Sequence, residues 1–529
     1  MNHAVIPAPV RFEVRAGHEF VFRPGTAVGY ADAGLAPVVE RFCSQITRRT
    51  GLKLAPTAGD PAADVPSVKV QLGSGSELAA LATPAGVSPT GDDPADERYS
   101  LEIDGHQVVL RAVEPAGVAR GLTTLTQLMV TSATASTAET TAGEIRVPGA
   151  RIFDAPRYAW RGLSLDLART WLTVGEIRRV IDLLELYKLN VLHLHLTDDQ
   201  AWRLPAGRPA AEPESGAPFY RGEDLRALVA YAADRFVTVV PEIDTPGHVS
   251  ALVRLHPELD TGGNHVEFEF PPGHQHRIVW LDPELPATFE LIEQVLADLA
   301  AIFPGRYIHI GGDEARGMPD DQYAAYVKRL RGLVRSLGRR PVGWQETARA
   351  ELSPDDIVQY WLTDFPLSPS LPPPVRALAE AELAMSRLDV EAIAAASVPV
   401  ILSPLSHCYF DVPYAEPSAD PAQADRQARV GLRVYAPQTV AESFDWEPAE
   451  ALGPGRDAQV AGIEAAIWSE TITGFDDLTF LLLPRLAGLA DKTWTAADWA
   501  GHRDRLARHG RLWEQDDLTY FRSSTVDWV

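Results

Sequence analysis

Cysteine and basic residues are scarce in this chain of 529 residues. The two cysteines, Cys43 and Cys408, lie far apart and form no Cys-x-x-Cys pair. This excludes a disulfide framework and makes a zinc–cysteine site unexpected. Lys and Arg total 48 against 72 Asp and Glu, which gives a net charge of −24. Because such a surface repels phosphate backbones, we expect no nucleic-acid partner.

Long apolar runs and an export leader are also missing. No run approaches the length of about 20 residues that a membrane-spanning helix needs. The N-terminus has no basic stretch followed by an apolar one. We therefore expect no membrane partner, and a cytoplasmic location, or a secreted one if a leader is missing from this sequence. Hydrophobic residues make up 46% and charged residues 23%, which is the composition of a folded protein with a large core.

The first part of the chain, residues 1–150, predicts an α+β accessory domain. Its predicted elements are a helix over 38–50, a strand over 68–72, a hairpin of 99–103 and 108–111, and a helix over 117–129. A Ser/Thr/Ala-rich stretch from 131 to 141 predicts a loop near the edge of this domain.

The remainder, residues 151–529, predicts an α/β fold, a (β/α)8 TIM barrel with a C-terminal helical segment. Short apolar strands alternate with amphipathic helices, which indicates parallel strands joined by crossovers. The eight predicted strands are 162–166, 191–196, 237–243, 307–310, 342–344, 357–361, 398–403 and 462–468. The predicted helices are 174–188, 224–234, 288–302, 321–337 and 478–491. An open doubly wound sheet is the alternative, but no Gly-rich phosphate turn supports it.

Prolines interrupt this pattern between the sixth and seventh strands. Five of them fall in 366–374 and predict a stretch without regular structure, followed by a short helix over 375–388. The role of the whole segment 364–397 stays open.

Charged and aromatic residues follow the predicted strands at the C-terminal ends, where barrel enzymes carry their sites. They are Asp166 and Arg169, Asp198 and Asp199, Glu242 to His248, Asp313 and Glu314, Trp344 to Glu346, Trp361, Tyr409 to Asp411, and Trp468 to Glu470. Sugar hydroxyls need charged hydrogen-bond partners, and the apolar face of a pyranose stacks on tryptophan. The rim therefore predicts a sugar site.

Asp313 and Glu314 are the most informative pair on this rim. Adjacent residues on an extended strand point to opposite sides, so they cannot flank a glycosidic bond as separated acid and nucleophile. If the chain turns after Gly311 and Gly312, the two carboxyls share one pocket. That arrangement fits substrate-assisted hydrolysis, in which the 2-acetamido oxygen of the sugar is the nucleophile. A neighbouring carboxylate also raises proton affinity, which predicts an acid that works near neutral pH.

Five segments carry a resemblance to a known family. They are Arg161–Arg169, Asn190–Trp202, Val240–His248, His309–Glu314 and Gly462–Glu470. Through them the chain resembles the glycoside hydrolase family 20 β-N-acetylhexosaminidases over most of 157–500. Residues before 150 resemble the small accessory domain of that family, notably over 117–128.

The resemblance implies retaining, exo-acting hydrolysis of terminal non-reducing N-acetyl-β-D-hexosamine residues through an oxazolinium intermediate. It implies no cofactor and no metal, with N-acetylhexosamine-terminated oligosaccharides or glycoconjugates as partners. Four points stay open: the preference for GlcNAc or GalNAc, the linkage of the natural substrate, the length of that substrate, and the oligomeric state of the protein.

The same resemblance implies a role for each matching residue. Glu314 would be the general acid and then the base, and Asp313 would hold the acetamido N–H. Tyr409 would hydrogen-bond the acetamido oxygen, while Asp198 and His248 would form a relay near Glu314. The aromatic wall would be Trp344, Trp361 and Trp468, and the hydroxyl ligands would be Arg169, Asp411 and Glu470.

Two other functions stay open. A metal-dependent barrel hydrolase would use His193-x-His195 with Asp198, Asp244 and His248. The two histidines lie inside a strand, however, and are predicted to be structural. A non-catalytic glycan-binding protein on the same fold is the third hypothesis. The chain departs from the family in the segment after Trp202 and at Gln345, where an acidic residue is often found.

Overall fold

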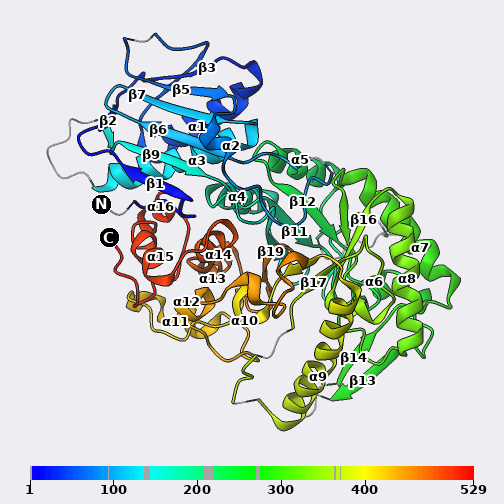
Figure 1. The fold of residues 1–529 in the computed structure, drawn as a ribbon. Helices are drawn as coiled ribbons and strands as arrows, with labels where there is room; N and C mark the ends of the chain where they lie inside the picture. Colours follow the sequence, from blue (N-terminus) through cyan, green and yellow to red (C-terminus); the bar gives the residue numbers. More distant parts are fainter. Residues whose placement is uncertain are drawn as a thin grey trace.

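The computed structural model describes residues 3–529 except 63, 93, 136–142, 206, 208–217, 270–274, 363–364 and 370. The chain forms an N-terminal sheet domain, blue to cyan in Figure 1, and a barrel with its surrounding helices, green to red. The predicted loop at 131–141 is wrong over 131–135, which are the last residues of the helix Pro115–Ala135. Residues 136–141 of this loop and most of the segment after Trp202 lie outside the described residues.

The N-terminal domain contains a seven-stranded sheet in the order β1-β9-β6-β7-β5-β3-β4. The strands are β1 (Arg11–Val14), β3 (Ala27–Tyr30), β4 (Ala55–Ala58), β5 (Ser67–Leu72), β6 (Tyr99–Ile103), β7 (Gln107–Ala112) and β9 (Ala150–Asp154). Helices α1 (Ala36–Thr50) and α3 (Pro115–Ala135) pack on each other and on this sheet. The predicted hairpin is present as the antiparallel pair β6–β7. Because β9 belongs to this sheet, the domain runs to Asp154, beyond the predicted boundary at 150.

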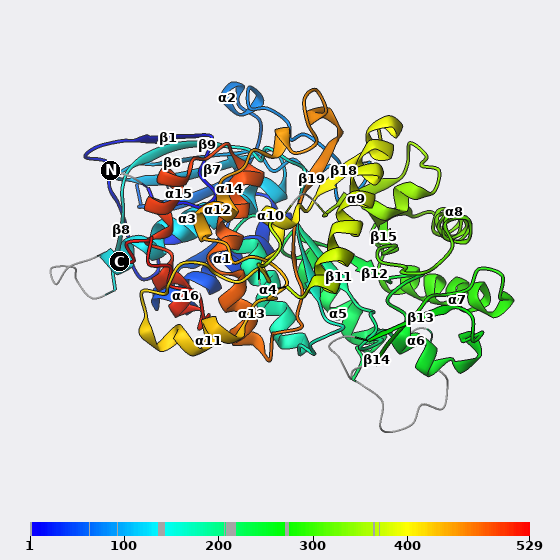
Figure 2. The same ribbon diagram turned by 90° about the horizontal axis from the view of Figure 1, so that it is seen from below.

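The predicted (β/α)8 barrel is confirmed, since eight parallel strands form a closed sheet. They are β10 (Trp160–Asp166), β11 (Val191–His195), β12 (Thr238–Glu242), β15 (Tyr307–His309), β16 (Arg340–Trp344), β17 (Ile357–Tyr360), β18 (Val400–Leu402) and β19 (Val460–Ile467). The outer helices include α4 (Val174–Leu186), α5 (Gly222–Ala233), α7 (Pro286–Ile302) and α8 (Asp320–Ser336). Figure 2 shows α5, α7 and α8 outside the strands that they connect.

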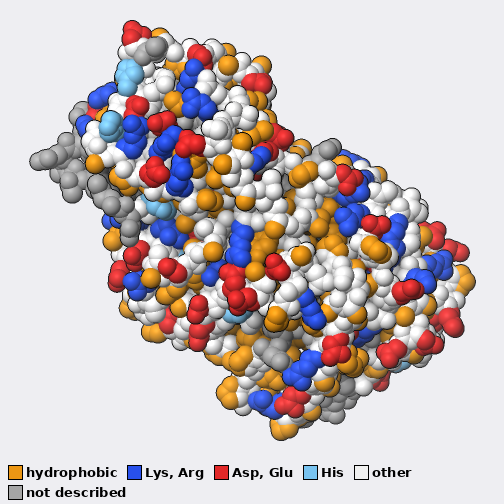
Figure 3. Space-filling model, viewed as in Figure 1, with side chains coloured by type: hydrophobic (Ala, Val, Ile, Leu, Met, Phe, Trp, Pro, Cys, Tyr) orange, Lys and Arg blue, Asp and Glu red, His pale blue; other side chains and the backbone are white. Residues whose placement is uncertain are grey.

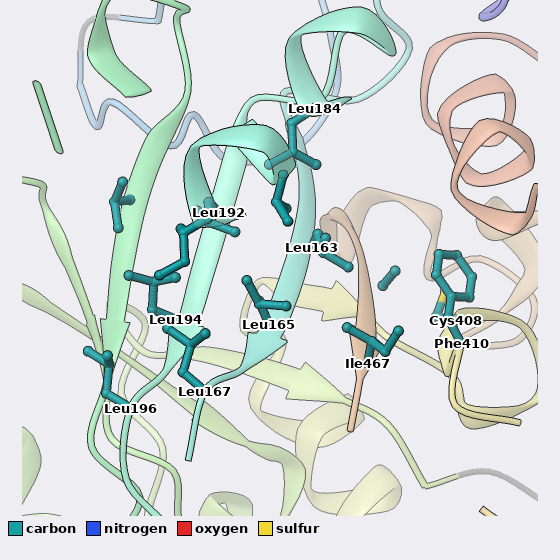
Figure 4. Close-up of a cluster of buried hydrophobic side chains, with 14 of the residues drawn as sticks. Leu163, Leu165, Leu167, Leu184, Leu192, Leu194, Leu196, Cys408, Phe410 and Ile467 are labelled. Carbon is teal, nitrogen blue, oxygen red and sulfur yellow. The ribbon is translucent and has the colours of Figure 1, made fainter. Parts of the chain in front are cut away.

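Leucines on the outer side of the first strands form the core between barrel and helices. Leu163 of β10 and Leu192 and Leu194 of β11 are fully buried near Leu184 of α4 (Figure 4). Burying each such side chain contributes about 1.5–3 kcal/mol. Because side chains alternate along a strand, the residues between these leucines face the barrel interior. This alternation places the histidines of β11 inside the barrel.

Two predicted elements were wrong in detail. The helix predicted over 478–491 is two helices, α13 (Phe475–Leu482) and α14 (Arg485–Trp494), because Pro484 has no N–H to continue the first. The predicted irregular stretch also ends early, since α9 (Pro373–Ala396) begins inside it and is longer than the predicted 375–388. Pro373 and Pro374 occupy the first helical turn, where the missing N–H has no helical partner to lose.

The accessory domain is joined to the barrel by buried charges. The Glu97 carboxylate accepts hydrogen bonds from Arg120 of α3 at 2.7 Å and from Arg161 of β10 at 2.7 and 2.8 Å. None of the helices in the described part of the chain is long and apolar enough to span a membrane.

Candidate active site

A glycine turn after β15 brings two carboxylates into one pocket. Gly311 has φ +67° and Gly312 has φ +103°, a region that residues with side chains rarely adopt. A Cβ on Gly311 would lie 1.8 Å from Asp244 Oδ1, so no side chain fits there. Asp313 and Glu314 follow directly and both line the pocket, as the predicted turn requires.

The imidazole of His248 faces both of these carboxyls through one ring nitrogen. Its Nε2 is 3.6 Å from Asp313 Oδ2 and 3.6 Å from Glu314 Oε2. Its Nδ1 is 3.3 Å from Asp198 Oδ1. His248 and Glu314 both have positive φ, +53° and +47°, a strained conformation typical of functional sites. Asp198, His248 and Glu314 therefore lie next to one another in this order, the arrangement that the family resemblance implies.

The series of hydrogen-bonded side chains continues from Asp198 into the barrel interior. His195 Nε2 lies 3.0 Å from Asp198 Oδ2, and its Nδ1 lies 2.6 Å from Glu242 Oε2. His193 bridges Glu464 at 2.8 Å and Glu242 at 3.1 Å. Both histidines thus have the carboxylate partners of buried structural histidines. His195 also lines the pocket. Side-chain alternation along the strand places this residue in the barrel interior but does not show that it reaches the pocket.

The two carboxyls of Asp313 and Glu314 have opposite pKa shifts. Burial, together with the charge of Glu314, raises the pKa of Asp313 to about 6. Burial also acts on Glu314, but the Arg316 guanidinium, 2.6 Å from its Oε1, and His248 lower the pKa of Glu314 to about 2. The predicted rise in proton affinity is therefore wrong for Glu314 in this structure and falls on Asp313. Arg316, which the sequence analysis did not single out, causes the difference.

Arg169 connects three carboxylates at the side of the pocket. Its guanidinium lies 3.2 Å from Asp166, 2.8 Å from Asp198 and 3.3 Å from Glu470. Glu470 retains 34% side-chain exposure, so it can meet a ligand. Asp411 is buried instead: its Oδ1 accepts the backbone N–H of Trp468 at an N···O distance of 3.5 Å, while its Oδ2 has no hydrogen-bond partner. Burial and Glu470 raise the pKa of Asp411 well above its usual range.

Three aromatic rings form one wall. Trp361 and Tyr409 lie nearly parallel with ring centroids 6.0 Å apart, and Trp468 meets Tyr409 edge-on at 5.9 Å. Trp344 does not line the pocket. It is 1% exposed, lies behind Trp468 at 5.9 Å, and donates its Nε1–H to Glu242 at 2.8 Å.

The pocket has a volume of about 270 Å³ at the C-terminal ends of the barrel strands. This is slightly below the range typical of small-molecule sites and suits one sugar residue at its base. Of the predicted site residues it is lined by Arg169, Asp198, His248, Asp313, Glu314, Trp361, Tyr409, Trp468 and Glu470.

Comparison with known families decides the classification. The model of the glycosyl hydrolase family 20 catalytic domain matches residues 158–323 and 316–497, and the model of that family's domain 2 matches residues 2–155. The chain belongs to glycoside hydrolase family 20. It is 35% identical to a β-N-acetylhexosaminidase of Cellulomonas fimi, over 99% of this chain and 97% of that protein.

Solved structures agree with this family 20 assignment. The GH20 β-N-acetylhexosaminidase from Streptomyces coelicolor A3(2) has a TM-score of 0.80 at 31% identity, over 99% of both chains. A mutant Streptomyces plicatus β-hexosaminidase in complex with product (GlcNAc) has a TM-score of 0.80 at 31% identity, over 99% of this chain and 98% of that one.

The chemistry of the histidines in this family 20 site does not favour the metal-dependent alternative. Both ring nitrogens of His193 and of His195 lie against carboxylates. Although burial opposes it, Glu242 and Glu464 raise the pKa of His193 to about 9, and Glu242 and Asp198 raise that of His195 well above its usual range. A protonated imidazole has no lone pair for a metal. In addition, Asp198 already forms an ion pair with the Arg169 guanidinium.

Two further carboxyls support the site. Asp244 lines the pocket and accepts the Gly312 N–H at 3.1 Å. Glu346 accepts the Trp361 Nε1–H at 3.1 Å and so fixes that ring. Burial and Asp313 raise the pKa of both carboxyls well above their usual ranges. Both fall within predicted rim segments, but only the fold shows what they contact.

Proposed function

We propose that this family 20 protein removes terminal non-reducing N-acetyl-β-D-hexosamine residues with retention of configuration, using the acetamido group as the nucleophile. One observation carries the proposal: Asp313 and Glu314 lie side by side around one imidazole, not on opposite sides of the pocket. A retaining enzyme with its own nucleophile needs two carboxyls facing each other across the glycosidic bond. The related proteins from Cellulomonas fimi and Streptomyces coelicolor carry the β-N-acetylhexosaminidase name.

Asp313 supplies the acceptor for the acetamido N–H. Its Oδ1 is buried without a hydrogen-bond partner, which is costly until a donor arrives. Tyr409 directs its hydroxyl at the acetamido oxygen, and Trp361 and Trp468 enclose the acetyl group. Holding the acetamido oxygen near C1 converts it into an intramolecular nucleophile, which gives a large proximity gain.

Substrate binding moves a proton between the two carboxyls. Between about pH 2 and about pH 6 the pair holds one proton, which lies on Asp313 in the free site. Because the amide N–H binds an ionised carboxylate more strongly than a neutral carboxyl, substrate binding favours transfer of that proton from Asp313 to Glu314. Arg316 then releases Glu314 and keeps its contact with Glu382 at 2.7 Å.

The bond changes follow from these positions. The acetamido oxygen bonds to C1 as the C1–O bond to the leaving group breaks, and Glu314 protonates the departing oxygen. Ionised Asp313 stabilises the positive oxazolinium. Water then attacks C1, Glu314 accepts its proton, and the acetamido group is restored with net retention.

The remaining hydroxyls of the sugar meet Arg169 and Glu470 at the pocket wall, with Asp411 behind them. Trp344 supports Trp468 from below instead of touching the sugar. We propose GlcNAc-terminated oligosaccharides or glycoconjugates as substrates, a choice supported by the GlcNAc product bound to the Streptomyces plicatus mutant.

The general acid is the direct test of this function. On N,N′-diacetylchitobiose, whose leaving group needs a proton, Glu314→Gln should lower kcat/KM by about 10²–10⁴-fold. The loss should shrink on an aryl glycoside with an acidic phenol, because that leaving group departs unprotonated. If the Glu314→Gln variant kept the wild-type kcat/KM on both substrates, the assignment of Glu314 as the general acid would be refuted.

A further inference from the structure

Helix α9 lies at the outer end of the pocket, beside the general acid. It runs from β17 to β18, yet only Ser386, Asp389 and Ile393 among its described residues are buried. In Figure 1 it lies along the lower edge of the molecule. Figure 3 shows hydrophobic side chains gathered in that same region of the surface.

Polar contacts attach one stripe of α9 to the barrel. Arg316 reaches Glu382 at 2.7 Å, and Gln345 Nε2 donates to Ser386 Oγ at 2.8 Å. Arg349 forms a bidentate pair with Asp389 at 2.9 and 2.8 Å. Positions 382, 386 and 389 share one face because they are four and three residues apart. These contacts fix the helix at a set distance from the catalytic carboxyls.

Gln345 connects α9 to the aromatic wall of the pocket. Its Oε1 accepts the N–H groups of Trp361 at 3.0 Å and Leu362 at 2.8 Å. Its NH2 group donates to Ser386, which a carboxylate at this position could not do.

The N-terminal half of α9 turns apolar side chains toward the pocket. The apolar residues that line the pocket here are Val375, Leu378, Ala379 and Leu383 of α9, together with Phe365 and Leu367 from the segment before it. Leu378 is 46% exposed, although it lines the pocket. Of the charged residues at this end, Arg316 is paired with both Glu314 and Glu382. Few charged groups are left for the hydroxyls of a second sugar.

This apolar end lies on the leaving-group side of the bond that breaks. Glu314 must face the glycosidic oxygen, and Arg316 links Glu314 to Glu382 of α9. Arg169 and Glu470, which we assign to the non-reducing sugar, pair with each other at 3.3 Å and make no described ion pair with α9. The leaving group is therefore the part of the substrate that meets the helix.

We propose that the N-terminal half of α9 is a leaving-group subsite that selects alkyl or aryl aglycones over a second hydrophilic sugar. This inference rests on the proposed hydrolysis and assigns its specificity. An aglycone that extends past the glycosidic oxygen buries its apolar surface against Leu378 and its neighbours.

A homologous series of alkyl β-N-acetylglucosaminides, from methyl to heptyl, tests the proposal. The alcohols are nearly equal leaving groups, so the series varies apolar length alone. We expect kcat/KM to rise by up to about fourfold for each methylene that reaches the helix, and the heptyl glycoside to exceed N,N′-diacetylchitobiose.

The variants Leu378→Asn and Leu388→Asn form a matched pair for this series. Both leucines are exposed on α9, at 46% and 56%, but only Leu378 lines the pocket. Leu378→Asn should flatten the rise, whereas Leu388→Asn should keep the wild-type slope. A flat wild-type series with normal turnover, or equal slopes in the two variants, would overturn the subsite and leave the hydrolase intact. Absence of turnover on every member would overturn both.

Discussion

Arg316 sets the protonation of the catalytic pair at the scale of single residues. Since the last proton leaves the pair as the pH rises through the raised pKa of Asp313, near 6, no general acid remains above that pH. We expect kcat/KM to fall there by roughly tenfold per pH unit. Arg316→Met removes a cation that interacts with both Glu314 and Asp313 and so favours loss of the last proton of the pair; the limb should therefore move to higher pH, whereas Arg316→Lys should keep it. An unmoved limb in Arg316→Met, measured on the same substrate, would contradict this role.

Most site residues could be predicted from the sequence because they follow barrel strands, whose C-terminal ends meet at one rim. Arg316 and Glu382 could not, because their contact depends on where α9 lies in space. The position of Trp344 was equally hidden. A tryptophan at a strand end predicts a pocket wall, but its Nε1–H bond to Glu242 holds it one layer deeper.

The β15 turn is the element that holds the chemistry in place. Gly311→Ala would force a Cβ to within 2.5 Å of the Asp244 backbone, so we expect a loss of about 1–3 kcal/mol of unfolding free energy. Activity should fall as well, because Asp313 and Glu314 follow this turn. Gly338→Ala is the matched control, with φ +71° but no atom within 4 Å of the new Cβ. It should be strained yet fully active, and equal kcat/KM for both variants would show that the turn is not critical.

Element boundaries show where sequence patterns stop being informative. Short apolar runs identify all eight barrel strands because parallel strands are buried on both faces. Proline has two meanings, however: it ends α13 at Pro484 and begins α9 at Pro373. Which applies depends on whether the missing N–H falls inside a helix or in its first turn.

The accessory domain supports the barrel from the end opposite the site. Its Val87 N–H bonds the Ala461 carbonyl at 2.8 Å, and Ser88 accepts the Tyr307 hydroxyl at 2.9 Å, both at strand beginnings. Among the described residues that line the pocket, none comes from the accessory domain. The domain thus stabilises the molecule without touching the substrate.

Glu97 tests this support at the scale of the whole molecule. Glu97→Gln leaves Arg161 buried without its counter-charge, so we expect unfolding to become easier by about 3–5 kcal/mol. Denaturant unfolding measures this, with Glu102→Gln, in an exposed pair with Arg15, as a control that should change by less than about 1 kcal/mol. Near-native kcat/KM of the folded Glu97 variant is also expected, and similar stability of the two variants would contradict the account.

The nucleophilic acetamido oxygen is the central claim, and substrates with graded acetamido nucleophilicity test it most directly. One aryl glycoside is prepared with N-acetyl, N-fluoroacetyl, N-difluoroacetyl and N-trifluoroacetyl groups, and kcat/KM is measured for each. Because each fluorine withdraws electrons from the carbonyl oxygen, we predict a steep and continuous fall in kcat/KM across the series. A flat series would mean that the attacking atom comes from elsewhere, and the account would be wrong.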